Sequence, residues 1–416
     1  MKLASGSATV QRHDPSHRAW LRSKADALFE FFEPRSIDRS GGFAVLDEAG
    51  QPMVAAGERE LHATTRMIHC FAIGHLLGRK GAAAIVDHGL RTLRVNHRDG
   101  KHGGYFWSFD RNGPRTRDKL TYGHGFVLLA GAAAKMIGHP DANALIADIS
   151  EVLEKRFWDA EQQASREEFR EDWSSFSDYR GQNANMHLTE ALMAAFEATG
   201  ETEFLRKAGR IAERIVNVNA RAADWRVPEH YRADWTVDRD YSGSVVFRPA
   251  GLTPGHALEW SRLIMQLHAL TNGAADWAPE AAGLLFRRAV AQGWDTRMGG
   301  FYYTTEFDGS VRVRDRLWWP VCEGAAAAAV IAEHARDEFF DGWYGRIWEF
   351  ADQRMIEASG AWTPQLDDDC KPIQGYFTGR GDIYHALQAC LIPLYSAKKG
   401  IVAAVHEAVA PSAGPA

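Results

Sequence analysis

Side chains that can transfer protons or hold oxygen atoms recur along this sequence at nearly constant intervals. Six of them follow one another 58 to 69 residues apart, at Arg66, His124, His187, His256, Glu323 and His385. Further polar or aromatic residues lie within four positions of these, namely Tyr122, Asn183, Glu259 and Trp319. Imidazole and carboxylate groups act as acids and bases near neutral pH, and arginine and amide groups stabilise negative charge on oxygen. If the chain brings these residues together, they predict a cleft for proton transfer on a small neutral ligand.

Each of these residues, taken alone, has an ordinary structural explanation. A histidine or asparagine at the start of a helix is often a helix cap or a buried polar group. His256 and Glu259 lie three residues apart on one helical face, where the carboxylate would raise the basicity of the imidazole, but this motif alone is weak. All six residues occupy nearly the same position within a repeat, which favours one shared site over six unrelated helix caps.

The elements that must position these residues are visible as an internal repeat. Segments that begin with Gly-Gly-aromatic at Gly41, Gly103 and Gly299 are typical of small hairpins, and degenerate copies start at Arg166, Asp224 and Gly360. Each is followed by a nearly apolar helical pattern and then by a helix with one apolar stripe. Six such pairs predict an all-α (α/α)6 barrel with short β-hairpin loops at its mouth, as a single domain over residues 15–398. If the inner helices run in the same sense, their first turns surround that mouth.

Composition narrows the class of protein. The 416 residues are 45% hydrophobic, enough for one large core, and the net charge is −6 without a long basic run. Nucleic acid and anionic membranes are therefore not expected partners. Because the sequence has neither an apolar signal core near its start nor a long apolar run, we expect a cytoplasmic protein. We interpret the alanine-rich residues 399–416 as a flexible tail.

No cofactor or metal is expected from the motifs. The glycine-rich segments lack the nucleotide-binding patterns, and the widely spaced cysteines predict reduced core thiols. Asp367 to Asp369 lie where a loop should turn, which favours a solvated turn over a metal site. His62, His69 and His75 have no acidic partner at a ligand-like spacing, so we interpret them as core or surface residues. We expect the long segment 229–249 to be either a lid over the mouth or a contact with a neighbouring subunit. The protein is expected to be a monomer or a homodimer.

Four motifs together resemble the N-acylglucosamine 2-epimerase superfamily. They are NANMH at Asn183, TPGHALEW at Thr253, WWPVCEG at Trp318 and GDIYHAL at Gly381, in this order on the helical hairpins. The asparagine-rich first motif is similar to the aldose-ketose isomerase branch, which contains mannose isomerases and sulfoquinovose isomerases. The resemblance extends over about residues 15–398.

The resemblance implies a cofactor-independent isomerase that interconverts D-mannose and D-fructose, and also D-lyxose and D-xylulose. It implies that His385 carries the proton between C2 and C1 and that His256, supported by Glu259, opens the sugar ring. Arg66, Asn183 and His187 would hold O1 and O2 of the enediolate. Tyr122, His124, Trp319 and Glu323 would position the ring and its distal hydroxyls.

Other functions stay open on the sequence alone. A 2-epimerase of the same fold would need His256 and His385 on opposite faces of C2. A sulfoquinovose isomerase would need cationic groups for the sulfonate, for which Arg248 and Arg380 are candidates. A glycoside hydrolase would need two carboxylates across the cleaved bond, from among Glu259, Glu323 and Asp382. A sugar-binding protein without activity is a further possibility.

Overall fold

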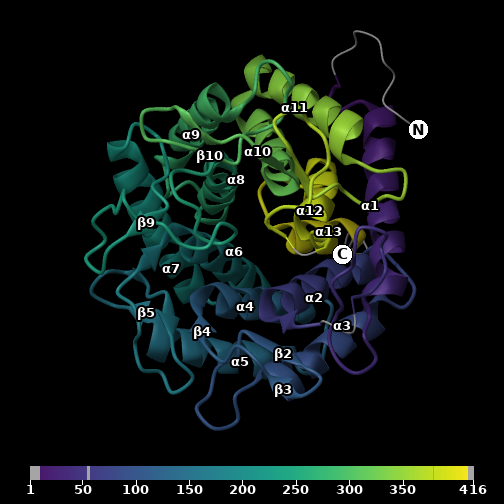
Figure 1. The fold of residues 1–416 in the computed structure, drawn as a ribbon, viewed down its shortest axis with the longest axis vertical. Helices are drawn as coiled ribbons and strands as arrows, with labels where there is room; N and C mark the ends of the chain where they lie inside the picture. Colours follow the sequence, from purple (N-terminus) through teal and green to yellow (C-terminus); the bar gives the residue numbers. More distant parts are fainter. Residues whose placement is uncertain (1–9, 54–56, 378, 411–416) are drawn as a thin grey trace, which may run out of the picture.

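Two concentric rings of helices form the molecule (Figure 1). The computed structural model describes residues 10–53, 57–377 and 379–410, and within these ranges twelve helices make up the rings. The inner ring consists of α2 (Leu61–Leu76), α4 (Thr121–Met136), α6 (Gln182–Thr199), α8 (Pro254–Leu270), α10 (Trp318–Ala335) and α12 (Tyr384–Leu391). The outer ring consists of α1 (Pro15–Ser36), α3 (Ala82–Thr92), α5 (Ala142–Val152), α7 (Thr202–Ala212), α9 (Ala278–Gly293) and α11 (Glu338–Phe350). Inner helices pack in sequence order and α12 packs back on α2, which confirms the predicted (α/α)6 barrel.

The two rings differ in the residues that they bury. Inner helix α10 is buried from Pro320 to Ala332, and its small alanines let neighbouring helices approach closely. Outer helix α7 buries one stripe, Phe204, Ala208, Ile211 and Ala212, and leaves its charged face in solvent. This is the difference that the helical patterns predict. Short π-helical turns continue several outer helices: η1 (Leu93–His97), η2 (Leu153–Phe157), η3 (Glu213–Ala220) and η4 (Ala351–Met355).

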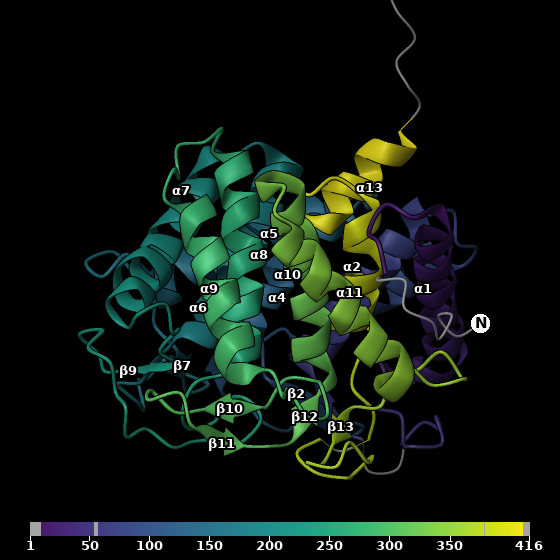
Figure 2. The same ribbon diagram turned by 90° about the horizontal axis from the view of Figure 1, so that it is seen from above.

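Short antiparallel strands gather at the end of the barrel where the inner helices begin (Figure 2). The strand that leads into an inner helix pairs with a strand of the following repeat, as β1 with β2, β4 with β7, β8 with β9, and β12 with β13. These pairings fix the first turns of the inner helices relative to one another. The strands are β1 (Arg59–Glu60), β2 (Ser108–Asp110), β3 (Gly113–Pro114), β4 (Lys119–Leu120), β5 (Trp158–Asp159), β6 (Ala164–Ser165), β7 (Glu168–Phe169), β8 (Arg180–Gly181), β9 (His230–Tyr231), β10 (Thr304–Thr305), β11 (Val311–Val313), β12 (Arg316–Leu317) and β13 (Gln365–Leu366).

The double glycines of the repeat have left-handed backbones. Gly103 and Gly104 have φ angles of 79° and 75°, and Gly299 and Gly300 have φ angles of 79° and 82°. Side chains with a Cβ atom rarely adopt this conformation. Backbone bridges such as Arg98 to Tyr105 close the turn around each pair. The Gly-Gly-aromatic signal therefore marks a tight turn between an outer helix and the loop that leads to the mouth.

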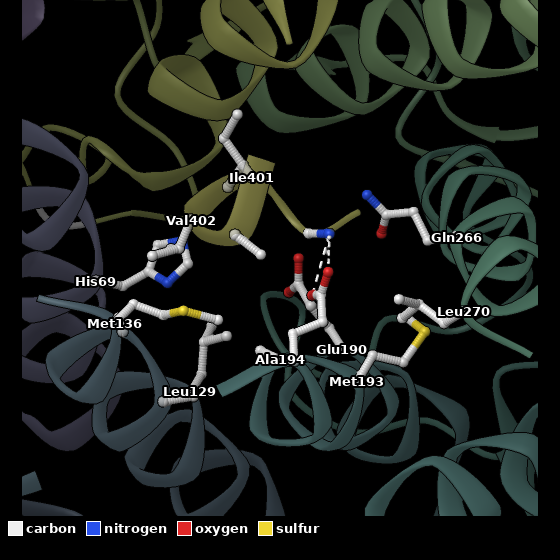
Figure 3. Close-up of a pocket in the computed structure, with 15 residues that line it drawn as sticks. His69, Leu129, Met136, Glu190, Met193, Ala194, Gln266, Leu270, Ile401 and Val402 are labelled. Atoms are coloured by element: carbon white, nitrogen blue, oxygen red, sulfur yellow. Dashed lines mark hydrogen bonds between the residues drawn. The ribbon is translucent and has the colours of Figure 1, made fainter. Parts of the chain in front are cut away.

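The C-terminal segment differs from the flexible tail that we expected. Ile401–Val409 forms a helix, α13, which lies at the end of the barrel opposite the strands (Figure 2). Its first five residues are buried, and Ile401 and Val402 line a pocket together with His69, Met136 and Gln266 (Figure 3). The prediction was wrong because the alanines of this segment pack against α2, α4 and α6. Residues 411–416 of the predicted tail lie outside the described residues.

The anchor of α13 should make stability depend on pH. The Gly400 backbone amide, at the start of α13, donates to both carboxylate oxygens of Glu197 at 3.1 Å, and burial raises the pKa of Glu197 to about 7. Since this folded-state pKa exceeds the ordinary value of 4.5, the folded chain binds the proton more tightly. The contribution of Glu197 is therefore fully present below pH 4.5 and lost as pH rises to about 7. We expect the free energy of unfolding in urea to fall less between pH 4.5 and 7 in Glu197→Gln than in the wild type. An equal dependence of this free energy on pH in the two proteins would contradict the assignment.

The remaining expectations about the chain body concern cysteines and membranes. Cys70, Cys322, Cys370 and Cys390 are buried free thiols, as the spacing predicts. Across the described ranges, no helix combines the length and apolar character that a membrane span requires.

Candidate active site

The first turns of the inner helices place side chains in two tiers at the mouth of the barrel. The upper tier contains His62, Tyr122, Asn183, His256, Trp319 and His385. The lower tier lies one helical turn deeper and contains Arg66, Phe126, His187, Glu259 and Glu323. Residues three or four positions apart share a helical face, so both tiers point into the same space. Ring centroids confirm the proximity, with Tyr122 and His187 separated by 5.1 Å and His187 and His385 by 6.5 Å.

His385 is held in one orientation by a carboxylate. Its Nδ1 atom lies 2.8 Å from Oε1 of Glu323, whose other oxygen accepts from Arg262 Nε at 3.1 Å. Burial alone would raise the pKa of Glu323, but Arg262 and His385 bring it below its usual value. An anionic partner at Nδ1 favours the proton there and leaves Nε2 as the basic atom. Each Glu323 oxygen thus has a protein partner, and this geometry favours a role in positioning His385 over the sugar contact that we expected.

His256 has the same arrangement with a residue that sequence reasoning missed. Its Nδ1 atom lies 2.9 Å from both oxygens of Glu229, which also accepts from Gln182 Nε2 at 2.7 Å. Burial would raise the pKa of Glu229, but His256 lowers it below the usual value. The expected partnership of His256 with Glu259 is wrong, since the supporting carboxylate comes from the loop before β9.

A glycine shapes the wall between the two histidines. The indole of Trp319 lies 4.9 Å from the His256 ring and 5.9 Å from the His385 ring. A Cβ atom added at Gly255 would come within 2.5 Å of Trp319. Glycine at this position thus makes room for the indole beside both imidazoles, and a flat aromatic wall of this kind suits the apolar face of a sugar.

Glu259 is a buried carboxyl group with free hydrogen-bonding capacity. It is 0% exposed, and neither oxygen has a hydrogen-bond partner among the described residues. Its Oε1 lies 3.6 Å from His187 Nδ1 and 3.7 Å from Arg262 Nη2. Burial and the nearby Glu323 raise the pKa of Glu259 well above its usual value. The unpaired oxygens of Glu259 can form a hydrogen bond with a hydroxyl group of a substrate.

Arg66 and His187 complete the lower tier as donors. Arg66 donates to Asp382 Oδ2 at 2.7 Å and to the Tyr122 hydroxyl at 2.9 Å. Burial would lower the pKa of Arg66, but Asp382 and the neighbouring tyrosines keep it above its usual value. Burial lowers the pKa of His187 to about 4, so its imidazole is neutral. A fixed cation and a neutral imidazole side by side can stabilise an oxygen atom that gains negative charge.

His124 does not face the cleft in the way that we expected. Its Nε2 accepts from the Tyr105 amide at 3.0 Å, and its Nδ1 donates to the Leu120 carbonyl at 2.8 Å. Both ring nitrogens are used by the backbone, so the predicted contact between His124 and a sugar is corrected to a structural role. This histidine ties the loop after η1 to the start of α4.

A segment of the long loop before α8 covers the upper tier. Asn183 Nδ2 donates to the Phe247 carbonyl at 3.1 Å, and the Tyr303 hydroxyl donates to the Val245 carbonyl at 2.7 Å. The Phe247 ring lies 5.6 Å from the ring of Tyr122. Within the segment 229–249, for which we expected a lid or a subunit contact, residues 245–247 therefore lie over the upper tier, and we refer to them as the lid. The amide nitrogen of Asn183 is thus used by the contact with Phe247, whereas its buried Oδ1 atom has no hydrogen-bond partner in the described structure.

Two groups of side chains have the composition of metal ligands. They are His187, Glu190 and Glu259, and Glu259, Glu323 and His385, each with ligand atoms within 4.8 Å of one another. Arg262 lies between them, 3.4 Å from Glu190, 3.7 Å from Glu259 and 3.1 Å from Glu323. Its guanidinium group supplies the positive charge that these carboxylates need, so the residues fit an internal cation better than a bound metal.

Comparisons with known proteins agree with this geometry. A model of the N-acylglucosamine 2-epimerase (GlcNAc 2-epimerase) family matches residues 41–389. The D-mannose isomerase of Pseudomonas cannabina pv. alisalensis is 38% identical over 389 residues, which cover 91% of this chain and 93% of the relative. The D-mannose isomerase of Thermobifida fusca is 39% identical over 388 residues, covering 91% and 94%. A crystal structure of a D-mannose isomerase, 32% identical, superposes with a TM-score of 0.85 and covers 90% of this chain and 97% of that one.

The match spans most of the chain and includes every inner helix that contributes to the two tiers. The sequence resemblance inferred from the four motifs is thus confirmed at the level of the family. The protein belongs to the N-acylglucosamine 2-epimerase family and is an enzyme of the sugar isomerase and epimerase class.

Proposed function

We propose that this enzyme interconverts D-mannose and D-fructose by proton transfer through a cis-enediol. The observation that carries the proposal is the matched pair of histidines, each with Nδ1 on a buried glutamate and both against the indole of Trp319. Two oriented imidazoles supply one group for ring opening and one for the proton shuttle. The D-mannose isomerases that resemble this chain over 91% of its length support the same reaction.

The chemistry assigns a separate step to each histidine. His256 exchanges a proton with the ring oxygen and the O1 hydroxyl, which opens the pyranose to the aldehyde. His385 Nε2 then removes the proton from C2, and the electrons of that bond form the C1–C2 double bond of the enediol as O1 gains charge. Arg66 and His187 stabilise the oxygens in this state, beside the carboxyl group of Glu259. The proton of the O2 hydroxyl then passes to O1, which becomes a hydroxyl group. His385 returns its proton to C1 as C2 and O2 form the ketone carbonyl of fructose.

Specific contacts weigh against the other candidate functions. Arg248 is paired with Glu168 and lies 4.4 Å over the ring of Tyr179, and Arg380 donates to Glu357 at 2.7 Å. Neither cation is free for a sulfonate, which disfavours a sulfoquinovose isomerase. Among the hydrolase candidates, Glu323 is held by His385 and Asp382 by Arg66. These carboxylates are not available as the acid and nucleophile of glycoside cleavage.

Proton NMR of EDTA-treated enzyme with D-mannose in D2O tests the proposal. Fructose should form, with some deuterium at C1, because the shuttle exchanges its proton with solvent during part of the turnovers. EDTA should leave the rate unchanged, since imidazoles carry out the transfers and Arg262 provides the internal positive charge. Glucose without fructose would replace the proposal by a 2-epimerase, and a rate restored only by added divalent metal would overturn the metal-free mechanism.

A further inference from the structure

His62 belongs to the upper tier but has no part in the proposed reaction. It is the second residue of α2, at the same level as Tyr122 on α4 and His385 on α12. Its ring stacks on Trp107 with centroids 5.2 Å apart at 15°, and it lies 5.9 Å from Tyr122 and 5.6 Å from Phe247 of the lid. The side chain is 12% exposed. A polar ring among three aromatic rings, beneath the lid, is placed to contact whatever the cleft holds.

The surroundings of His62 fix its charge. Burial first, and Arg66 next, lower its pKa to about 3, so the imidazole is neutral. Its Nδ1 lies 3.6 Å from Oε2 of Glu60, which is longer than a hydrogen bond, and Nδ1 has no hydrogen-bond partner among the described residues. A neutral imidazole has one nitrogen that donates and one that accepts, so the ring can form a hydrogen bond with a hydroxyl group in the cleft.

The proposed function determines which part of the sugar reaches this wall. C1 and C2 must lie near His256 on α8 and His385 on α12, with Trp319 on α10 between them. In the ring of inner helices, α2 lies across from α8 (Figure 1). In the proposed reaction, Arg66 of α2 contacts the reacting oxygens from the lower tier. Within the upper tier, a hexose whose reacting end faces α8, α10 and α12 therefore extends its other end toward the first turns of α2 and α4. The group at that end is the C6 hydroxymethyl.

We propose that His62, with Trp107 and Phe247, forms a subsite for the C6 hydroxymethyl group, in which the neutral imidazole of His62 forms a hydrogen bond with the O6 hydroxyl. The inference rests on the proposed function and predicts that the enzyme prefers hexoses to pentoses. Trp107 and Phe247 contact the C5–C6 bond, and the lid closes over it. D-Lyxose has the ring hydroxyls of D-mannose without C6, so it cannot use the subsite.

Three sugars and two variants test this subsite. kcat/KM is measured with D-mannose, 6-deoxy-D-mannose and D-lyxose for the wild type, His62→Leu and His62→Gln. His62→Leu should lower kcat/KM for D-mannose about tenfold and change that for 6-deoxy-D-mannose by no more than about twofold, because only the former has the O6 hydrogen bond. His62→Gln, which keeps an acceptor, should recover part of the loss. His75→Leu, on the exposed far end of the same helix, serves as the matched control.

The outcomes separate the two proposals. Equal losses with all three sugars in His62→Leu would show that His62 only supports the structure and would overturn the subsite. An unchanged kcat/KM for D-mannose would overturn it as well. A wild-type enzyme that converts none of the three sugars would instead overturn the proposed function.

Discussion

His385→Asn is expected to lower kcat for the conversion of D-mannose to D-fructose by about 10²- to 10⁴-fold, the usual contribution of a positioned acid-base group. Asparagine keeps a donor for Glu323, which accepts from His385 Nδ1 at 2.8 Å, but it has no basic atom in place of Nε2. The substitution therefore removes the shuttle and preserves the buried pairing. Steady-state kinetics and exchange of the C2 proton in D2O should both decline, while urea unfolding stays close to that of the wild type.

His256→Asn distinguishes the role of the shuttle from that of ring opening. Because a small fraction of each sugar is open-chain in solution, this variant should keep exchange of the C2 proton while turnover falls. The glutamate partners differ accordingly, since Glu229 holds His256 and Glu323 holds His385. If exchange persisted in His385→Asn and vanished in His256→Asn, the two roles would be reversed. His75→Asn, on an exposed position of α2, controls for loss of a histidine as such.

The fold was predictable because one local signal recurs clearly in three of the six repeats and in degenerate form in the others. Double glycines such as Gly103 and Gly104 occupy left-handed backbone positions that other residues avoid, so their spacing reports the repeat directly. The helix that follows each loop is buried on nearly all sides, and its nearly apolar sequence predicts this burial. The C-terminal helix α13 was missed because its nine residues, Ile401–Val409, are too short and too rich in alanine to differ from a tail before packing is known.

The site was predictable as a set of helices but not as a set of contacts. The constant interval located the right helical turns, yet it combined residues of the upper tier with residues of the lower tier. His124 has the phase of a site residue, but the Tyr105 amide and the Leu120 carbonyl take both its nitrogens. Helix phase counted from the first residue of each inner helix would have kept Tyr122, excluded His124 and added His62.

The carboxylates were the hardest residues to assign from sequence. Glu229 lies 27 positions before His256 in the sequence, and no spacing rule describes that separation. Glu259 has the expected helical spacing from His256, but its side chain lies beside His187 and Arg262. Asp382, considered only for a hydrolase, holds Arg66. Loop conformation and the side-chain packing of the core decide these pairings, and neither is visible in the local sequence.

Arg262→Met is expected to destabilise the protein by about 3–5 kcal/mol, the typical cost of leaving buried charges without their partner. The Arg262 side chain is 1% exposed and contacts Glu323 at 3.1 Å and Glu190 at 3.4 Å. Methionine fills a similar volume without a charge, so these carboxylates would have to take up protons or admit water. Urea unfolding at pH 7 measures the loss. Activity should fall too, because a protonated Glu323 would no longer fix the tautomer of His385.

Two further variants decide whether the effect comes from buried charge. Arg287→Met removes an arginine of the outer ring, whose ion pair with Asp337 has side chains 43% and 41% exposed, and should cost about 1 kcal/mol or less. Adding Glu190→Gln to Arg262→Met removes one of the orphaned carboxylates and should recover part of the lost stability. If Arg262→Met lowered the free energy of unfolding no more than Arg287→Met, the buried carboxylates of Glu190 and Glu323 would not need the charge of Arg262. Recovery of stability by Glu190→Gln would show that Arg262 balances the charge of the glutamates beneath His385. Glu190, Glu259 and Glu323 could then lie together without a metal ion.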